Sequence, residues 1–139
     1  MEGRVRALPD STRTAPEAAA AIGVEVGQIV KSLLFAGPSG ATVLVLAAGD
    51  NRVDERKISA LVGEKVRMAD PDTVRSRTGF AIGGVPPVAH AEPSPVLVDE
   101  TFRRFGEVWA AAGTPLTVFP LSPAELLAIT AGREAGLAR

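Results

Sequence analysis

The run Gln28-Ile29-Val30-Lys31-Ser32-Leu33-Leu34-Phe35 is short, apolar and partly β-branched, and it ends at Ala36-Gly37-Pro38. Such a run, bounded by glycine and proline, predicts a buried β-strand. The segment 37–40 predicts a tight turn, and a second run, Thr42–Ala48, is almost wholly apolar. We therefore expect an antiparallel hairpin that is buried on both faces.

Lys31 places a full charge inside the first of these strands. Burying an unpaired charge is costly, so such a residue is rare unless something nearby needs it. Only three of the fifteen basic residues are lysines, namely Lys31, Lys57 and Lys65. Lysine is a compact charge whose pKa shifts readily on burial, which suits a functional lysine. The alternative is an edge-strand lysine whose stem lies along apolar surface while its ammonium group stays in water. The strand alone leaves both interpretations open.

Length and composition predict one domain over residues 1–139. The chain has 139 residues, of which 46% are hydrophobic and 22% charged, as in an ordinary soluble globular protein. No apolar run approaches the roughly 18 residues that span a membrane, and the N-terminal residues lack the apolar core of a signal peptide. These features predict a cytoplasmic protein without membrane contact.

Several chemistries are excluded by composition. Without cysteine there is no disulfide, no thiolate nucleophile and no cysteine-ligated zinc. His90 is the only histidine, so a histidine-rich metal site is excluded, and a serine–histidine triad would have to use His90. The formal net charge of −1 gives no general attraction to nucleic acid, so such binding needs a local basic patch. The candidate patches, which are equally explained as solvated faces, are Arg52/Arg56/Lys57, Arg75/Arg77 and Arg103/Arg104.

Helix caps and turn residues predict an α+β fold. Four short helices are expected to begin after Thr14, Asp54, Asp70 and Ser122. Further strands are expected at 5–8, 66–68, 96–99, 108–112 and 116–119, with a helical turn at 101–105. Because hairpins replace regular βαβ units, the sheet is expected to be mixed. We expect Trp109 to lie in the core and the tail 132–139 to fray.

The segment Thr78-Gly79-Phe80-Ala81-Ile82-Gly83-Gly84-Val85-Pro86-Pro87-Val88 shows no helix or strand periodicity. Paired glycines let the backbone approach a ligand and turn its N–H groups towards one point, and paired prolines keep the loop stiff. The loop therefore suits an oxyanion hole, although a structural turn is the simpler interpretation of this segment alone. His90 is a candidate acid or base, but a lone loop histidine is more often a surface residue or a local hydrogen-bond partner. Asp50, Asp54 and Asp99 are candidate carboxylate partners, of which the last two also suit N-caps.

Together these segments resemble the YbaK-like family of aminoacyl-tRNA deacylases, which is related to the editing domain of bacterial prolyl-tRNA synthetases. The similarity covers nearly the whole chain in the expected order. Its most specific part is the lysine strand combined with the glycine–proline loop. The matching segments are 11–19, 28–35, 49–54, 68–71, 78–80, 83–87, 96–99 and 121–127.

The resemblance implies a single α+β domain with a mixed, mostly antiparallel and barrel-like sheet flanked by short helices. It also implies hydrolysis, without metal or cofactor, of the ester that joins a wrong amino acid to the tRNA 3′ end. The catalytic residues would be Lys31, which corresponds to the family's essential lysine, and Gly83, Gly84 and Val85. The substrate-binding residues would be Ser32, Asp50, Phe80, Pro86, Pro87 and His90.

For tRNA binding we select Arg52, Arg56 and Lys57, because they directly follow the turn at the end of the strand that pairs with the Lys31 strand. The expected function is that of a trans-editing hydrolase acting on mischarged tRNA(Pro), or a related tRNA, that carries a small wrong amino acid. A prolyl-tRNA synthetase is a second candidate partner. Water would be the nucleophile, since an aminoacyl ester is already activated and needs mainly positioning and charge stabilisation.

Two other classes of function stay open. One is a catalytically inactive module of the same fold that binds tRNA or a synthetase, and it is favoured by Pro86, where the family commonly has serine. The other is an ordinary α+β domain with an edge-strand lysine. The chain has no tyrosine to match the one found in cysteinyl-tRNA-specific members, and their later serine and aspartate are replaced by residues within 110–112 and by Thr117. The amino acid removed is therefore not assigned.

Overall fold

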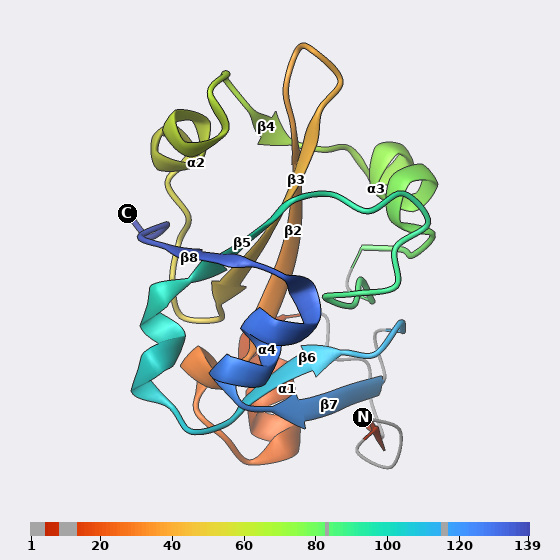
Figure 1. The fold of residues 1–139 in the computed structure, drawn as a ribbon. Coiled ribbons are helices and arrows are strands. Elements are labelled where there is room, and N and C mark those ends of the chain that lie inside the picture. Colours follow the sequence, from red (N-terminus) through yellow and green to blue (C-terminus); the bar gives the residue numbers. More distant parts are fainter. Residues whose placement is uncertain (1–4, 9–13, 83, 115–116) are drawn as a thin grey trace.

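A long antiparallel hairpin forms the centre of the fold in a computed structural model that describes residues 5–8, 14–82, 84–114 and 117–139. Strand β2 (Val30–Ala36) pairs with β3 (Thr42–Ala48), with Lys31 opposite Ala47. Figure 1 shows this hairpin running through the molecule, with α1, β6 and β7 at one end and α2, β4 and α3 at the other. The predicted hairpin is confirmed.

The hairpin belongs to a mixed sheet of five strands among the described residues, in the order β4-β2-β3-β5-β8. Strand β4 (Arg67–Met68) is antiparallel to β2, whereas β5 (Val96–Asp99) is parallel to β3 and β8 (Arg133–Ala135) is parallel to β5. A second, antiparallel sheet has the order β1-β7-β6. Its strands are β1 (Arg6–Ala7), β7 (Thr117–Leu121) and β6 (Val108–Ala111).

The expectation of a barrel-like sheet is wrong, because the two sheets do not close on each other. Within the described ranges they are joined by one isolated bridge between Ile29 and Trp109. The outer strands β4 and β8 are only two and three residues long, and each pairs with a single neighbour. Closing a barrel requires every strand to have two partners. The α+β class with a mixed sheet is confirmed.

The helices begin where capping chemistry predicts. The side chains of Thr14, Asp54, Asp70 and Ser122 each accept a hydrogen bond from a backbone N–H in the first turn of the helix that follows. These helices are α1 (Ala15–Ile22), α2 (Glu55–Val62), α3 (Pro71–Thr78) and α4 (Pro123–Thr130). Two 3₁₀ segments, η1 (Val26–Gln28) and η2 (Glu100–Arg104), complete the helical elements of the described residues. None of the described helices is long and apolar enough to cross a membrane.

The core lies on both faces of the hairpin. One cluster, which includes Leu44, Leu46 and Phe102, packs between the larger sheet and β6, β7 and α4. The other cluster, on the opposite face, includes Phe35 and Ile58. Strand β3 is buried along almost its whole length, but β2 is only half-buried from Lys31 to Leu33. The expectation that the whole hairpin is buried therefore holds for β3 and is wrong for the first half of β2.

The C-terminal segment is ordered, so the expectation that 132–139 frays is wrong. Strand β8 adds to the edge of β5, and Leu137 is fully buried in the cluster around Phe35 and Ile58. The Leu137 carbonyl accepts a hydrogen bond from the Asp54 N–H at 2.7 Å. The segment is ordered because its backbone pairs with the edge of β5 and its Leu137 side chain fills the core.

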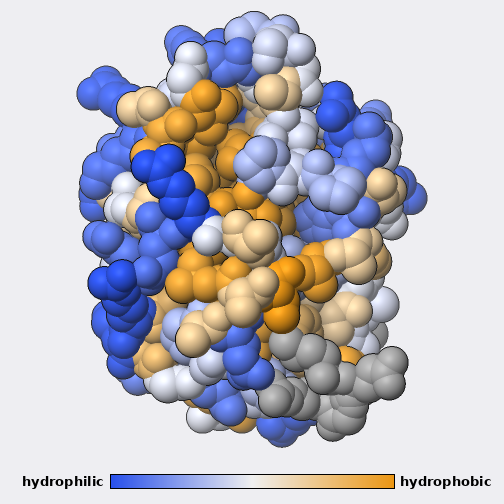
Figure 2. All heavy atoms as spheres, viewed as in Figure 1, coloured by the Kyte–Doolittle hydropathy of each residue, from blue (hydrophilic) through white to orange (hydrophobic). Residues whose placement is uncertain are grey.

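Apolar side chains also reach the surface. Figure 2 shows them down the middle of one face, between hydrophilic residues at either side. Among the described residues the large hydrophobic side chains that are more than a third exposed are Val5, Met68, Ile82 and Ile129. Of these four residues, Ile82 also lines the main pocket.

Candidate active site

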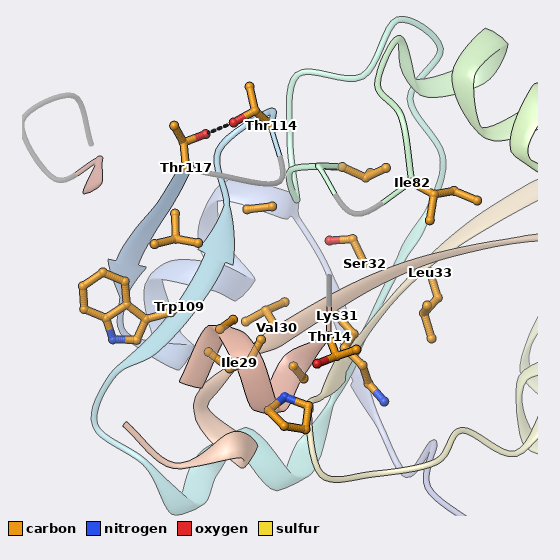
Figure 3. Close-up of a pocket in the computed structure, with 17 residues that line it drawn as sticks. Thr14, Ile29, Val30, Lys31, Ser32, Leu33, Ile82, Trp109, Thr114 and Thr117 are labelled. Carbon is orange, nitrogen blue, oxygen red and sulfur yellow. Dashed lines mark hydrogen bonds between the residues drawn. The ribbon is translucent and has the colours of Figure 1, made fainter. Parts of the chain in front are cut away.

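A pocket of about 420 Å³ lies where the two sheets face each other. Strand β2 contributes four consecutive lining residues, Val30–Leu33, which follow the lining residue Ile29, and α1 with its cap contributes residues between Thr14 and Ala18. The smaller sheet contributes residues between Trp109 and Val118, and the glycine–proline loop contributes Ile82 and Val85. Figure 3 shows these side chains around the pocket, with Trp109 and Leu33 on opposite sides of the view.

The pocket exists because one edge of β2 has no strand beside it. Ile29 bridges to Trp109, and Phe35 pairs with Met68, but from Lys31 to Leu33 the described residues offer no partner strand on that edge. The Leu34 carbonyl accepts a hydrogen bond from the Ala69 N–H across this edge. Because backbone groups alternate between the two edges of a strand, the Ser32 N–H and carbonyl face the same edge. The pocket wall therefore offers backbone donors and acceptors as well as side chains.

Lys31 is the charged residue of the described pocket lining. Its Nζ donates to the Asn51 carbonyl at 2.7 Å in a partly buried position. Burial lowers the pKa of Lys31, the nearby charges of Asp50 and Asp99 oppose this effect, and the charge of Arg52 adds to it. The ammonium group is thus held against a backbone carbonyl at a pocket, which favours the functional interpretation over that of a solvated edge lysine.

Two residues of the pocket lining each carry a buried polar atom that has no hydrogen-bond partner among the described residues. These atoms are Ser32 Oγ and Trp109 Nε1. Most buried polar groups in proteins are hydrogen-bonded, and an unpaired one is costly, so these two atoms are exceptions beside the pocket. Trp109 is half-buried and packs against the buried residues Ala18, Ala19 and Ile29, so the prediction of a core residue holds in part, although Trp109 also lines the pocket.

The glycine–proline loop is packed rather than free. Gly84, Val85, Pro86 and Pro87 are all buried, and the predicted catalytic Gly83 lies outside the described residues. A Cβ on Gly84 would come within 2.9 Å of the Thr114 Cα, so this glycine permits a close backbone approach to the β6–β7 turn. The Gly84 N–H donates to the Ala81 carbonyl. Among the described residues the Val85 N–H has no such partner, and Val85 lines the pocket.

Several predicted substrate-binding residues support the loop from behind instead of lining the pocket. His90 Nε2 lies 2.6 Å from the Pro86 carbonyl, and the Phe80 and His90 rings are 6.3 Å apart. His90 is therefore a local hydrogen-bond partner. Of the predicted substrate-binding set, Ser32 alone lines the main pocket within the described chain.

The remaining predicted residues lie on the turn after β3 and at the start of α2. Asp50 forms a two-pronged ion pair with Arg104, with both N–O distances at 3.0 Å, and this contact lowers the pKa of Asp50. Arg52 is close enough to lower the pKa of Lys31, whereas Lys57 Nζ donates to the Ala138 carbonyl. Arg52, Arg56 and Lys57 are outside the pocket lining. Arg103 is paired with Glu134 and Arg104 with Asp50, so the candidate patch Arg103/Arg104 is already engaged in ion pairs.

Some lining residues were not predicted from the sequence. Ile82, Thr114, Trp109 and Ala111 line the pocket, and the last two lie on the same face of β6 because they are two residues apart. That alternation was a usable signal once the strand was recognised. Thr114 Oγ1 lies 2.8 Å from Thr117 Oγ1, and both threonines border the pocket. The described residues contain no group of three or more His, Asp or Glu side chains that could hold a metal ion.

Comparison with known proteins gives one family. The family model described as "Aminoacyl-tRNA editing domain" matches residues 9–129. The uncharacterised protein YwhH of Bacillus subtilis (strain 168) is 38% identical over 125 residues, which are 90% of this chain and 80% of that protein. A proline–tRNA ligase of Thermosipho melanesiensis is 38% identical over 79 residues, which cover 56% of this chain but only 14% of the ligase.

Two further relatives carry more specific names. EbsC of Enterococcus faecalis, provisionally named a Cys-tRNA(Pro)/Cys-tRNA(Cys) deacylase, is 26% identical over 121 residues, which are 86% of this chain and 74% of that protein. A crystal structure provisionally described as that of a trans-editing enzyme for prolyl-tRNA synthetase is 54% identical, with a TM-score of 0.92 over 97% of this chain and 85% of that chain. The resemblance drawn from the sequence motifs is confirmed, and this chain belongs to the aminoacyl-tRNA editing domain family.

Proposed function

We propose that this protein is a trans-editing aminoacyl-tRNA deacylase that removes a small wrong amino acid from tRNA(Pro) or a related tRNA. The observation that carries the proposal is the half-buried Lys31 of the pocket lining, whose ammonium group is held against the Asn51 carbonyl. Membership of the editing family and the similarity to EbsC and to the trans-editing structure support it.

The proposed reaction is hydrolysis of the ester between the amino acid and the terminal ribose. Water attacks the ester carbonyl carbon, the bond from that carbon to the ribose oxygen breaks, and the ribose oxygen takes up a proton. Charge develops on the carbonyl oxygen, so a fixed donor there lowers the barrier. We assign this role to the Lys31 ammonium group and the Val85 N–H, which belong to residues of the pocket lining.

The pocket favours an uncharged and small amino-acid side chain. Apart from Lys31, the described lining residues are apolar or carry neutral hydroxyl or indole groups. Ala111, Thr117 and Ile29 would surround such a side chain, and a pocket discriminates by size when larger groups meet its wall. The lining residues that the structure describes include no carboxylate that would pair with a basic substrate side chain.

The test is to incubate the protein with a panel of tRNAs charged with different amino acids and to measure amino-acid release. We expect release of a small amino acid from tRNA(Pro) and slow or no release of proline from its own tRNA. The panel should include alanine, serine, cysteine and threonine as small side chains, and phenylalanine as a large one. Release from none of these tRNAs would contradict the proposal. It would favour the alternative hypothesis of an inactive module that binds tRNA or a synthetase.

A further inference from the structure

Asp99 is a buried carboxylate outside the pocket lining, at the end of β5. Asp99 is only 1% exposed to solvent, and its side chain accepts four hydrogen bonds. Oδ2 accepts from the Ala48 N–H at 3.1 Å and from Asn51 Nδ2 at 2.9 Å. Oδ1 accepts from the Thr101 N–H at 3.0 Å and from Thr101 Oγ1 at 2.8 Å. The carboxylate is thus fully hydrogen-bonded although it is buried.

The Asp99 carboxylate is charged at neutral pH. Burial alone would raise the pKa of Asp99, but the hydrogen bonds from Asn51, Thr101 and Ala48 together lower it below the usual value. A buried anion of this kind stabilises a nearby cation, and Asp99 is one of the two carboxylates that favour the charged form of Lys31.

One residue connects Asp99 to Lys31. The Asn51 side chain is anchored on Asp99 and also donates to Thr101 Oγ1 at 2.8 Å. The Asn51 carbonyl accepts from Lys31 Nζ at 2.7 Å. The Asn51 N–H donates to the Ala48 carbonyl at 3.0 Å, which closes the turn after β3. The backbone N–H, the backbone carbonyl and the side-chain Nδ2 of Asn51 are therefore all held by hydrogen bonds.

We propose that Asp99 is a positioning residue for Lys31, acting through Asn51. It fixes the turn so that the Asn51 carbonyl holds the ammonium group at the pocket edge, and it supplies a permanent negative charge behind that contact. The consequence for catalysis rests on the proposed function, whereas the effect on the Lys31 ammonium group does not.

Helix capping, a simpler role for Asp99, accounts for only half of its hydrogen bonds. Asp99 is the N-cap of η2, since it accepts from the Thr101 N–H, and a cap needs nothing more. The other two donors, Ala48 N–H and Asn51 Nδ2, come from the end of β3 and the turn after it. They tie the carboxylate to the Lys31 side of the sheet, which a cap does not require.

The first test observes Lys31 directly. Because the chain has only three lysines, protein labelled with ¹³C at the lysine ε-carbon should give three NMR signals, and Lys31→Arg assigns one of them. The charged groups that face Lys31 are Asp50, Asp99 and Arg52, with Arg104 paired to Asp50. In Asp99→Asn the Lys31 signal should titrate at lower pH than in the wild type, because one of its two favourable charges is gone.

The matched control is Asp70→Asn. Asp70 is also an N-cap, and its replacement by Asn also removes one negative charge. It caps α3, however, and does not contribute to the pKa of Lys31. The Lys31 titration should be unchanged in this variant. A folded Asp99→Asn protein whose Lys31 titrates as in the wild type would overturn the proposal, whether or not the protein is a deacylase.

A second variant covers the case in which Asp99→Asn does not fold. Asn51→Ala keeps the buried charge and the carbonyl but removes the anchor between them. We expect deacylation by Asn51→Ala to fall about 10- to 100-fold in kcat, because a small misplacement of a catalytic group has effects of this size. KM should change little, since neither Asn51 nor Asp99 lines the pocket.

The pH profile separates positioning from stability. If Lys31 acts as an ammonium group, kcat/KM falls as pH rises through its pKa, and in Asp99→Asn this falling limb should move to lower pH. An unchanged profile with less folded protein would show that Asp99 is only structural. Absence of deacylation in the wild type would instead contradict the proposed function, and the NMR titration would still decide the role of Asp99.

Discussion

Lys31 combines two properties that act against each other. Its strand buries the stem and lowers the pKa of the ammonium group, while the Asn51 carbonyl and two nearby carboxylates keep the charged form stable. A lysine in this situation is a strong point donor at the wall of a pocket. The sequence could predict its importance, because a lone charge in an apolar strand is visible without a structure. It named Asp99 only as one of three candidate carboxylate partners and did not indicate Asn51, since the contacts that join them to Lys31 span 20 and 48 positions in the chain.

Lys31→Ala should abolish deacylation and leave the fold intact. Since burial lowers the pKa of Lys31, the native state disfavours its charge, and removing that charge should leave the unfolding midpoint unchanged or raise it. Lys31→Arg should be inactive too, because a planar fork does not fit a site that holds a compact ammonium group. Amino-acid release and thermal unfolding are measured side by side.

Lys65→Ala is the matched control, because Lys65 is exposed and lies outside the pocket lining. It should retain full activity. Full activity in Lys31→Ala, or its failure to fold, would show that Lys31 has no catalytic role.

The helices could be predicted from local sequence signals, whereas the strand pairing between distant segments could not. The N-caps at Thr14, Asp54, Asp70 and Ser122 were readable from the sequence, because capping depends on neighbours within three residues. Strand β8 was not, because Arg133–Ala135 has no strand pattern of its own and is ordered only by the edge of β5. The two separate sheets were missed for the same reason, since sheet closure depends on contacts between distant strands.

The glycine–proline loop is expected to affect turnover more than substrate affinity. Gly84→Val should lower kcat more than it raises KM, because a side chain at this position meets the Thr114 backbone and shifts the neighbouring Val85 N–H. Steady-state kinetics with a mischarged tRNA measure both constants.

Gly106→Val is the control for that experiment, because a Cβ at Gly106 meets nothing within 4 Å. It should behave as the wild type. Equal loss of affinity for charged and uncharged tRNA in Gly84→Val would mark the loop as a docking surface, with no role in the transition state.

For the whole molecule, a net charge of −1 leaves tRNA binding to local patches. We predict that replacing Arg52 and Arg56 together by Glu raises KM, flattens the dependence of KM on salt and leaves kcat mostly unchanged. The reason is that phosphate contacts release counterions, so fewer contacts give a smaller salt slope. KM is measured at several salt concentrations.

The charge-matched control replaces Lys65 and Arg133, both exposed and outside the pocket lining, by Glu. It has the same net charge as the test variant, so it separates a local contact from a general charge effect. If both double variants show the same KM and salt slope, the tRNA-binding surface lies on another face.

Acid should destabilise the fold through specific carboxylates. Hydrogen bonds with Arg104 lower the pKa of Asp50, and the network described above lowers the pKa of Asp99. Their stabilising effect is complete above the unfolded-state pKa of about 3.9 and is lost as pH falls through the native pKa, because the unfolded chain then binds more protons. Urea unfolding between about pH 6 and pH 2 should therefore show a falling free energy, with a shallower fall in Asp99→Asn. An equal slope in that variant would mean that Asp99 does not take up its proton in this range.

The composition of the pocket has a consequence for the order of folding. The β2–β3 hairpin joins neighbouring segments, so it can form early from local contacts. The pocket instead collects Thr14, Lys31, Val85 and Thr117, which are spread over most of the sequence. Closing such large loops is slow, and the pocket is therefore complete only when both sheets have docked. A partly folded molecule would keep the hairpin and its lysine but have no binding site, so a ligand of the pocket recognises finished molecules alone and shifts the folding equilibrium towards them.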